Sequence, residues 1–454
     1  MMRVVERLAA FAEGYRARPI DPQVLHYAKR AVIDWYAALY PGSVVTPATL
    51  LERAFAEEIG RDGDGNEGGN KARLADGRRA NARAAALING AAAHTVEVDD
   101  IYRDGIYHPG APTIAAALAV AQAKGASGEQ FVRAVIVGYE ISTRIAAAMG
   151  RAHYKYWHNT GTIGCFGAAS AAAEIIGLDR VRFAHALATV TTFAAGLQQA
   201  FRSDSMSKPM HAGRAAEAGV TAALAAARGV TGSLDIVEGE AGFGRAMGYA
   251  DAGEGPDWER ALATLGEDFH ICRMTVKNHA CCGHAFAAID GALALKARMG
   301  VSAKEIARVR VGGYRATLEV AGIAEPATAA EARFSTPYLV ATALTHGSVR
   351  LAAFEQPRLG NAETRSLMRR VELALDPAVD AAFPAQRSAR VAIESRDGRR
   401  AEHFQPTRKG DPDMPLSDAE LDAKYLELAA PVLGEEKARA QLARLWTLER
   451  QSRL

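Results

Sequence analysis

Between about residues 80 and 266, apolar residues recur at helical spacing in nearly every segment of the chain. The pattern is broken mainly at glycines and at Pro109-Gly110, residue types that end helices. Alanine is abundant and aromatic residues make up only 7% of the chain, which favours closely packed helices over β-sandwiches. We therefore expect this long region to be almost entirely helical.

The pattern changes near residue 270. Residues 307–311 and 390–395 alternate apolar and polar side chains, as half-buried strands do. Residues 396–399, Arg-Asp-Gly-Arg, supply a hairpin turn before a third short run at 402–404. These strand patterns predict a region of mixed α and β structure.

Helical patterns at 282–299 and 334–345 lie between the predicted strands, and helix returns towards the C-terminus. The predicted fold class is therefore mainly α. A large all-α domain is formed by both chain ends, residues 1–270 and 409–454, and a smaller α+β domain, residues 271–408, is inserted into it.

Bulk composition excludes several classes of function. The net charge of +2 over 454 residues gives no electrostatic case for binding nucleic acid, and no basic tract indicates a membrane surface. Charged residues interrupt the N-terminal segment, which is not typical of a secretory signal, and the longest apolar runs are too short to span a membrane. The four cysteines lack the spacing of zinc or iron–sulfur sites, so we expect a cytoplasmic protein.

Four polar segments interrupt the apolar sequence, and we expect them to converge on one pocket for a small polycarboxylate. They are His94–His108, Tyr154–Gly164, Ser203–Gly213 and Lys277–His284.

The first segment places His94, Glu97, Asp99 and Asp100 close together, with His108 following. Carboxylates so close repel one another, and burial would raise the pKa of one of them, as a general acid requires. An alternative is a helix C-terminus that leaves into a solvated acidic loop. A third interpretation is a site for a divalent cation.

The second segment contains His158 at the start of a helical pattern in which Gly161, Gly164 and Gly167 follow at intervals of three. Such glycines permit close approach of another helix. A dinucleotide-binding loop is not expected, because no strand pattern precedes the segment and the glycine spacing is not GxGxxG. His158 either caps the helix or faces a ligand anion.

The third segment, Lys208–Gly213, precedes a helix predicted at 214–228. A lysine beside the unpaired amides of a helix N-terminus suits a bound carboxylate, with His211 next to it. The fourth segment offers Lys277 and cysteines that are either nucleophiles or small buried residues; burial is the commoner fate.

Together the four segments resemble the MmgE/PrpD family, which contains 2-methylcitrate dehydratases, cis-aconitate decarboxylases and iminodisuccinate epimerases. The resemblance covers nearly the whole chain. It is carried by the order and spacing of His94-x-x-Glu97-x-Asp99-Asp100, His108-Pro109, Trp157-His158-x-Thr160-Gly161-Thr162-x-Gly164, Lys208-Pro209-x-His211-x-Gly213 and Lys277 with the Cys-rich run after it.

The resemblance implies an α+β lid over the all-α domain, a homodimer, a pocket between the two domains, and chemistry without a metal or an organic cofactor. It implies acid–base roles for His108 and His158 and an active-site role for Lys208. On the lid, Lys277 is similar to a lysine that holds a substrate carboxylate, and Tyr314 to a lid tyrosine.

The chain departs from the decarboxylase-like members at two positions. Glu97 stands where those members have the first aspartate of a DFDD motif. Cys282 stands where they have a lid histidine, and His284 follows two residues later. The predicted substrate-binding residues are therefore Lys277, His211, Tyr314, Cys282 and His284.

The shared chemistry of the family is a carbanion next to a carboxylate. It needs positive charge where negative charge develops, which Lys208, Lys277 or a protonated histidine can supply. One histidine would remove the proton, and the second, aided by Glu97 or Asp100, would protonate the leaving group. Elimination of water is the first expectation, with epimerisation and decarboxylation as alternatives. Rival hypotheses are a non-catalytic helical or anion-binding protein and a metal-dependent hydrolase.

Overall fold

The computed structural model describes residues 2–60, 72–201, 205–248 and 255–454, and the chain is mainly α-helical. It divides into two units, which are described separately. Unit 1 comprises Met1–Thr275 and Asp418–Leu454, and unit 2 comprises Val276–Ser417.

Unit 1 is built from helices from both ends of the chain. The helices are α1 (Val4–Arg16), α2 (Pro22–Ser43), α3 (Ala48–Ala54), α4 (Ala82–Ala93), α5 (Gly110–Lys124), α6 (Gly128–Tyr154), α7 (Asn159–Thr162), α8 (Gly164–Ile176), α9 (Arg180–Thr191), α10 (Ser207–Ala227), α11 (Phe243–Met247), α12 (Trp258–Leu262), α20 (Asp418–Leu433) and α21 (Glu435–Trp446). The strands β1 (Ala72–Arg73) and β2 (Arg79–Ala80) form a small antiparallel hairpin.

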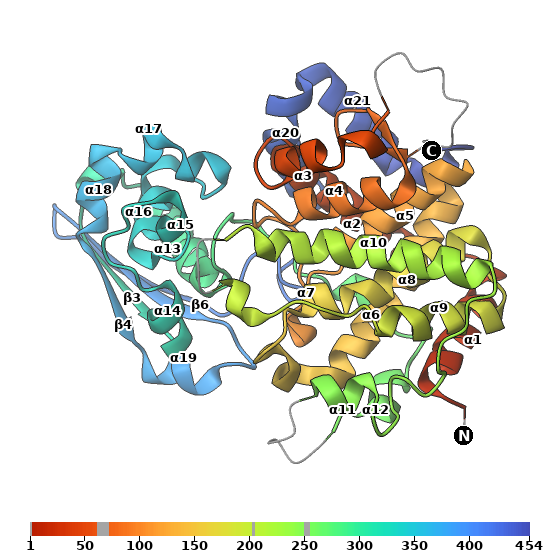
Figure 1. Cartoon of the computed structure of the whole chain (residues 1–454). Helices are drawn as coiled ribbons and strands as arrows, with labels where there is room; N and C mark the ends of the chain where they lie inside the picture. Colours follow the sequence, from red (N-terminus) through yellow and green to blue (C-terminus); the bar gives the residue numbers. More distant parts are fainter. Residues whose placement is uncertain (1, 61–71, 202–204, 249–254) are drawn as a thin grey trace. The chain divides into compact units, whose positions relative to one another are not determined.

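The core of unit 1 lies where α5, α6 and α10 pack around α8 and α4 packs on α5 and α10, and α20 packs beside α2 (Figure 1). α5 is buried along almost its whole length, since every residue from Gly110 to Ala121 is buried. Helix starts follow local sequence signals: the Asp21 side chain accepts hydrogen bonds from the amides of Gln23 and Val24 at the start of α2.

The predicted start of the helix after Lys208 is wrong. α10 begins at Ser207, so Lys208 and His211 lie within its first turns instead of before them. Pro209 is tolerated because the first amides of a helix have no partner within it. Gly213 does not end a helix; a Cβ on it would lie 2.2 Å from the Leu87 carbonyl oxygen, so glycine allows α10 to approach α4 closely.

Unit 2 contains a mixed sheet in the order β4-β3-β5-β6. Its elements are α13 (Phe286–Met299), β3 (Ile306–Gly313), α14 (Arg315–Ala321), α15 (Ala329–Ala332), α16 (Thr336–His346), α17 (Gln356–Leu359), α18 (Ala362–Met368), β4 (Val371–Leu375), α19 (Pro377–Ala382), β5 (Ala389–Ser395) and β6 (Arg400–Gln405). Helix α13 packs on β5 and β6 and contacts α16.

The two strands predicted from alternation are confirmed as β3 and β5, and the run predicted after the hairpin turn is confirmed as β6. β5 buries every second residue, and it pairs antiparallel with β6 across the predicted turn, with Glu394 opposite Arg400. β4, which pairs parallel to β3, was not predicted. Among the described residues, the helices lack the combination of length and apolar character that crossing a bilayer demands.

Candidate active site

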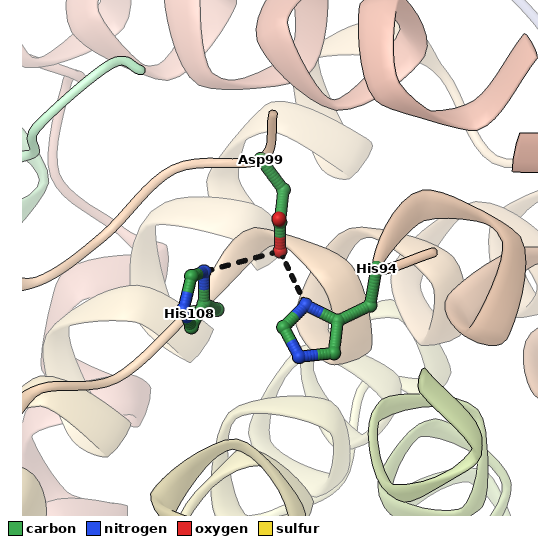
Figure 2. A group of neighbouring side chains, drawn as sticks. All are labelled: His94, Asp99 and His108. Carbon is green, nitrogen blue, oxygen red and sulfur yellow. Dashed lines mark hydrogen bonds and ion pairs between the residues drawn. The ribbon is translucent and has the colours of Figure 1, made fainter. Parts of the chain in front are cut away.

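Two histidines and an aspartate lie together at the end of α4 and in the segment that follows it (Figure 2). His94 is the first residue after α4, and its Nδ1 is 2.7 Å from Oδ2 of Asp99. Nδ1 of His108 lies 3.2 Å from the same oxygen. His94 and Asp99 are fully buried, whereas His108 keeps 12% of its side chain exposed. The carboxylate is thus shared by two imidazoles, one of which reaches the surface.

The charge state of Asp99 follows from this arrangement. Burial by itself would raise the pKa of Asp99, but the two imidazoles, His94 and His108, lower it well below its usual range. Asp99 is therefore a carboxylate at neutral pH, and it stabilises positive charge on the imidazoles beside it. Nε2 of His94 and Oδ1 of Asp99 are buried with no hydrogen-bond partner among the described residues.

The same three side chains could hold a divalent cation. Each offers one ligand atom, and these atoms lie within 4.8 Å of one another. Two imidazoles and one carboxylate form a donor set suited to first-row transition metals. If the segment binds a divalent cation, as one interpretation of the sequence holds, these three side chains are the candidate ligands.

A second pair of histidines continues the group. His158 precedes α7 and is 2% exposed, and its Nδ1 lies 3.0 Å from Nδ1 of His211 on α10. The rings of His108 and His94 are 4.7 Å apart, those of His94 and His158 are 5.4 Å apart, and those of His158 and His211 are 5.2 Å apart. We call these four side chains the imidazole row.

The histidines of the row have different electrostatic surroundings. Burial, followed by the nearby His94, Lys208, His211 and His108, lowers the pKa of His158 well below its usual range. Burial, His94 and Lys208 also lower the pKa of His211. His158 is therefore neutral at physiological pH, while His108 lies beside the Asp99 carboxylate. Such a difference between neighbouring titratable groups is typical of acid–base sites.

Hydrogen bonds from the first turn of α7 fix the row. The Asn159 side chain donates to the Gly105 carbonyl at 2.6 Å, and the amide of His108 donates to the Thr160 hydroxyl at 3.3 Å. Gly161 permits this packing, because a Cβ there would lie 2.4 Å from the Ala195 carbonyl oxygen and 3.0 Å from Cβ of His211. The close approach expected from the glycine spacing is thus found at this position.

Lys208 forms an ion pair with Glu97 next to the row. Both side chains are about a quarter exposed, at 25% and 29%. Burial would lower the pKa of Lys208, but the charge of Glu97 and its hydrogen bond raise it above the usual value. Glu97 has a φ of 61°, in the left-handed region that residues other than glycine rarely adopt.

Asp100 points into the protein. Its carboxyl group accepts a hydrogen bond from the Tyr139 hydroxyl at 2.8 Å and one from the amide of Gly110 at 3.0 Å, where α5 begins. Burial, with the negative charge of Asp34, raises the pKa of Asp100 to about 8. These two hydrogen bonds hold the segment against α5 and α6 and point the Asp100 carboxyl group at partners outside the imidazole row.

The predicted lid residues belong to unit 2. Nδ1 of His284 lies 2.8 Å from the Tyr314 hydroxyl, and the Tyr314 ring stacks on Phe383. Burial, with Arg387 and Arg408, lowers the pKa of His284 to about 4. Lys277 is 4% exposed, and Cys282 is partly exposed.

Five of the predicted residues, from three separate polar segments, come together in unit 1: Glu97, His108, His158, Lys208 and His211. The sequence interpretation named Glu97 or Asp100 as the carboxylate that aids the histidines, but Asp99 is the one that contacts them. His94 was likewise not named as a site residue. The compact spacing of His94, Asp99 and His108 was visible in the sequence, but it did not show which carboxylate turns towards the rings.

Comparison with known proteins gives a consistent result over the whole chain. The MmgE/PrpD N-terminal domain matches residues 6–253, and the MmgE/PrpD C-terminal domain matches residues 279–449.

Curated relatives are similar along nearly their full length. The cis-aconitate decarboxylase-like protein oryM of Aspergillus oryzae is 27% identical, over 96% of this chain and 92% of that relative. The cis-aconitate decarboxylase of Aspergillus terreus is 25% identical, over 96% and 91%. The human cis-aconitate decarboxylase is 23% identical, over 95% and 88%. With both domains matched in order, the chain belongs to the MmgE/PrpD family.

Proposed function

We propose that the protein is a lyase that forms a carbanion next to a carboxylate of a small di- or tricarboxylate. The observation that carries the proposal is the imidazole row, in which two members have different surroundings. His158, an inner member of the row, is neutral because burial lowers its pKa, and His108, at one end, lies beside the ionised Asp99. The ammonium group of Lys208 adds permanent positive charge nearby.

In the proposed mechanism, His158 accepts the proton from the carbon next to the carboxylate. His108 acts as the acid, because the Asp99 carboxylate stabilises its imidazolium form. Lys208 exchanges its partner Glu97 for a substrate carboxylate and stabilises the negative charge that develops. No metal or organic cofactor takes part in these steps.

Elimination of water uses two members of the row, His158 and His108. The C–H bond breaks as His158 takes the proton, and the electron pair forms a carbon–carbon double bond. The C–O bond breaks, and the hydroxyl leaves as water with the proton from His108. After this step His158 is protonated and His108 is neutral. Before the next turnover a proton passes from His158 back to His108, along the row or through solvent. A dehydratase of the 2-methylcitrate type is the reading that this two-sided arrangement supports.

Decarboxylation is the second candidate, and the names of the relatives favour it. In that reaction the bond to a carboxylate breaks, CO₂ leaves, and a single acid protonates the carbanion. His108 alone would suffice as that acid. Because His158 is neutral, a substrate carboxylate beside it would have no cationic partner there, which favours its loss as CO₂. In either reaction, Lys277, Tyr314, Cys282 and His284 of unit 2 are the proposed substrate contacts.

The test is turnover of a panel of di- and tricarboxylates in D₂O, followed by proton NMR and by CO₂ release. Appearance of an unsaturated acid with loss of water supports the dehydratase. CO₂ release supports the decarboxylase, and deuterium incorporation without net product indicates an epimerase. If none of these occurs with any substrate of the panel, the proposed function is wrong.

Metal analysis separates the proposal from a metal-dependent hydrolase at His94, Asp99 and His108. Treatment with a chelator should leave turnover within twofold of the untreated protein, and added Zn²⁺, Mn²⁺ or Fe²⁺ should not raise it. One stoichiometric divalent ion whose removal abolishes turnover would overturn the metal-free mechanism.

A further inference from the structure

The segment between α4 and α5, residues 94–109, holds the carboxylate and the histidine on which the proposed chemistry depends. Two of its residues have a left-handed backbone, Glu97 with φ 61° and Ile106 with φ 46°. Backbone in this region costs free energy for such residues, and it persists only where the surrounding structure holds it in place. The contacts that hold this segment therefore matter for the site.

One of these contacts comes from the C-terminal part of the chain. Lys424 lies on α20 and is 1% exposed. Its ammonium group donates to Oδ1 of Asp34 on α2 at 2.5 Å and to the carbonyl oxygen of Val98 at 2.7 Å. A single buried cation thus links α20, α2 and the peptide that immediately precedes Asp99.

The position of this contact gives it a direct effect on the imidazole row. The Val98 carbonyl belongs to the peptide group joined to Asp99, so a shift of that peptide moves the Asp99 carboxylate. The carboxylate contacts His94 at 2.7 Å and His108 at 3.2 Å. Displacements of about 1 Å at such distances are enough to lower turnover by up to about 100-fold.

A stabilising role alone is a weak account of Lys424. Lysine is almost never fully buried unless it is paired, and a buried ion pair often adds nothing to stability compared with apolar residues of similar size. Asp34 retains a buried carboxylate oxygen, Oδ2, with no hydrogen-bond partner among the described residues. The contact that distinguishes this pair from a simple ion pair is the bond to the Val98 carbonyl.

We propose that Lys424 is a positioning residue of the site: through the Val98 carbonyl it fixes the Asp99 carboxylate between His94 and His108. The C-terminal helix α20 is thereby a functional part of the active site, although it supplies no group that touches substrate. The kinetic part of this proposal rests on the proposed function, but the structural part does not.

The main test is the double variant Asp34→Asn/Lys424→Met in the full-length protein. It removes both buried charges together, so neither is left without a partner, and it removes the donor to Val98. We expect circular dichroism like that of the unmodified protein, a KM within about threefold, and a kcat lowered by about 10–100-fold. An unchanged kcat in the folded variant would overturn the proposal.

Two further variants separate positioning from general loss of packing. Asp34→Asn/Lys424→Gln restores a neutral donor near the Val98 carbonyl, and we expect it to recover at least several-fold of the lost kcat. If the glutamine and methionine variants lose kcat equally, the hydrogen bond to Val98 has no positioning role. The matched control is Arg16→Met/Glu174→Gln, which removes a bidentate ion pair between α1 and α8 in the same unit and should leave kcat unchanged.

Hydrogen exchange tests the structural part without any substrate. Peptides covering 95–107 should exchange faster in the methionine double variant, while those covering α8 should not. If that variant does not fold, native-state hydrogen exchange of the unmodified protein provides the test. Residues 95–100 and helix α20 should lose protection at the same denaturant concentration. Loss of protection in 95–100 at a lower denaturant concentration would contradict the proposal. Absence of turnover in the unmodified protein bears only on the proposed function.

Discussion

The histidines of the imidazole row in unit 1 and His284 of unit 2 have different kinds of partners. In unit 1 four imidazoles contact one another in a row, and an ionised carboxylate, Asp99, lies at one end. In unit 2 His284 has a neutral partner, the Tyr314 hydroxyl. His279, also in unit 2, pairs separately with Asp290, whose second oxygen accepts a hydrogen bond from the amide of Lys409.

This difference separates proton transfer from binding. A row of titratable groups with unequal proton affinities can pass a proton and carry charge for a moment. Burial keeps His284 neutral, with a pKa of about 4, and its partner is a tyrosine hydroxyl and not a carboxylate that would stabilise an imidazolium ion. We therefore propose the acid–base steps for unit 1, and substrate binding for Lys277, Tyr314, Cys282 and His284 of unit 2.

The largest expected effects come from the imidazole row. His158→Gln and His108→Gln should each lower kcat by about 10²–10⁴-fold, the usual contribution of a general acid or base. Because His158 is already neutral, a neutral amide in its place should leave helical content unchanged. Steady-state kinetics and circular dichroism check this, with the partly exposed His26→Gln of α2 as the matched control.

A histidine-to-glutamine substitution in unit 2 tests whether proton transfer is confined to unit 1. His284→Gln should lower kcat less than tenfold, because the side chain is expected only to bind. A loss as large as that of His158→Gln would place proton transfer in unit 2 as well.

Lys277→Met should act mainly on KM. A hydrogen bond to a charged group contributes about 1.5–3 kcal/mol, which corresponds to a KM higher by about 10–100-fold. We expect kcat to change less than KM, as measured by steady-state kinetics. A variant with unchanged KM would remove Lys277 from the substrate contacts, and Lys304→Met, an exposed lysine of the same unit, serves as the control.

Asp100→Asn should change how stability depends on pH. Burial raises the pKa of Asp100 to about 8 in the folded state, above the unfolded value of about 3.9. The folded state therefore binds the extra proton between these values, and this contribution to stability is lost as pH rises towards 8. The asparagine variant, which mimics the protonated acid, should gain up to about 1.4 kcal/mol per pH unit over the unmodified protein from pH 5 to 8.

Chemical denaturation at pH 5, 6.5 and 8 measures this gain, with Glu57→Gln, an exposed carboxylate, as control. The same variant should keep kcat within a few-fold, because Asp100 bonds to Tyr139 and Gly110. If the difference in the free energy of unfolding does not change with pH, the raised pKa of Asp100 is wrong. A strong loss of kcat would show that Asp100 takes part in the acid–base steps.

The smallest effect concerns the backbone at Glu97. Glu97→Gly and Glu97→Ala both remove the ion pair with Lys208, but only glycine adopts a φ of 61° without steric cost. The glycine variant should therefore be more stable than the alanine variant by about 1 kcal/mol in the free energy of unfolding. Equal stability would show that the left-handed conformation is not retained once the ion pair is gone.

Local sequence patterns predicted much of the secondary structure. The strands β3 and β5 were visible because each alternates over several residues, β6 because a hairpin turn precedes it, and the start of α2 in Asp21-Pro22. The strand β4 was not predicted: it is only five residues long, and Ala374 stands where an alternating pattern would have a polar residue. The start of α10 was misplaced because Pro209 and Gly213 look like helix breakers when their packing is unknown.

The candidate site was predictable as a set of residue types and not as an arrangement. His108, His158, Lys208 and His211 stood out as polar residues in otherwise apolar sequence, and the resemblance to the family implied the roles of His108, His158 and Lys208. Asp99 and Asp100 are adjacent and chemically equivalent in the sequence, yet one contacts two imidazoles and the other contacts Tyr139 and Gly110. Their opposite directions depend on the backbone between α4 and α5, which includes the left-handed Glu97.

The sequence by itself determined the helical character of the long region from α4 to α12, the mixed structure that follows it, and the residue types that could carry acid–base chemistry. These follow from periodicity and composition, which are local properties of the chain. Only the tertiary structure decided which carboxylate serves the histidines, that the rings of His108, His94, His158 and His211 form a row, and that Lys424 reaches the peptide before Asp99. The physical reason is that these contacts join residues up to 326 positions apart, whose distance and side-chain direction are set by helix packing and not by neighbouring sequence.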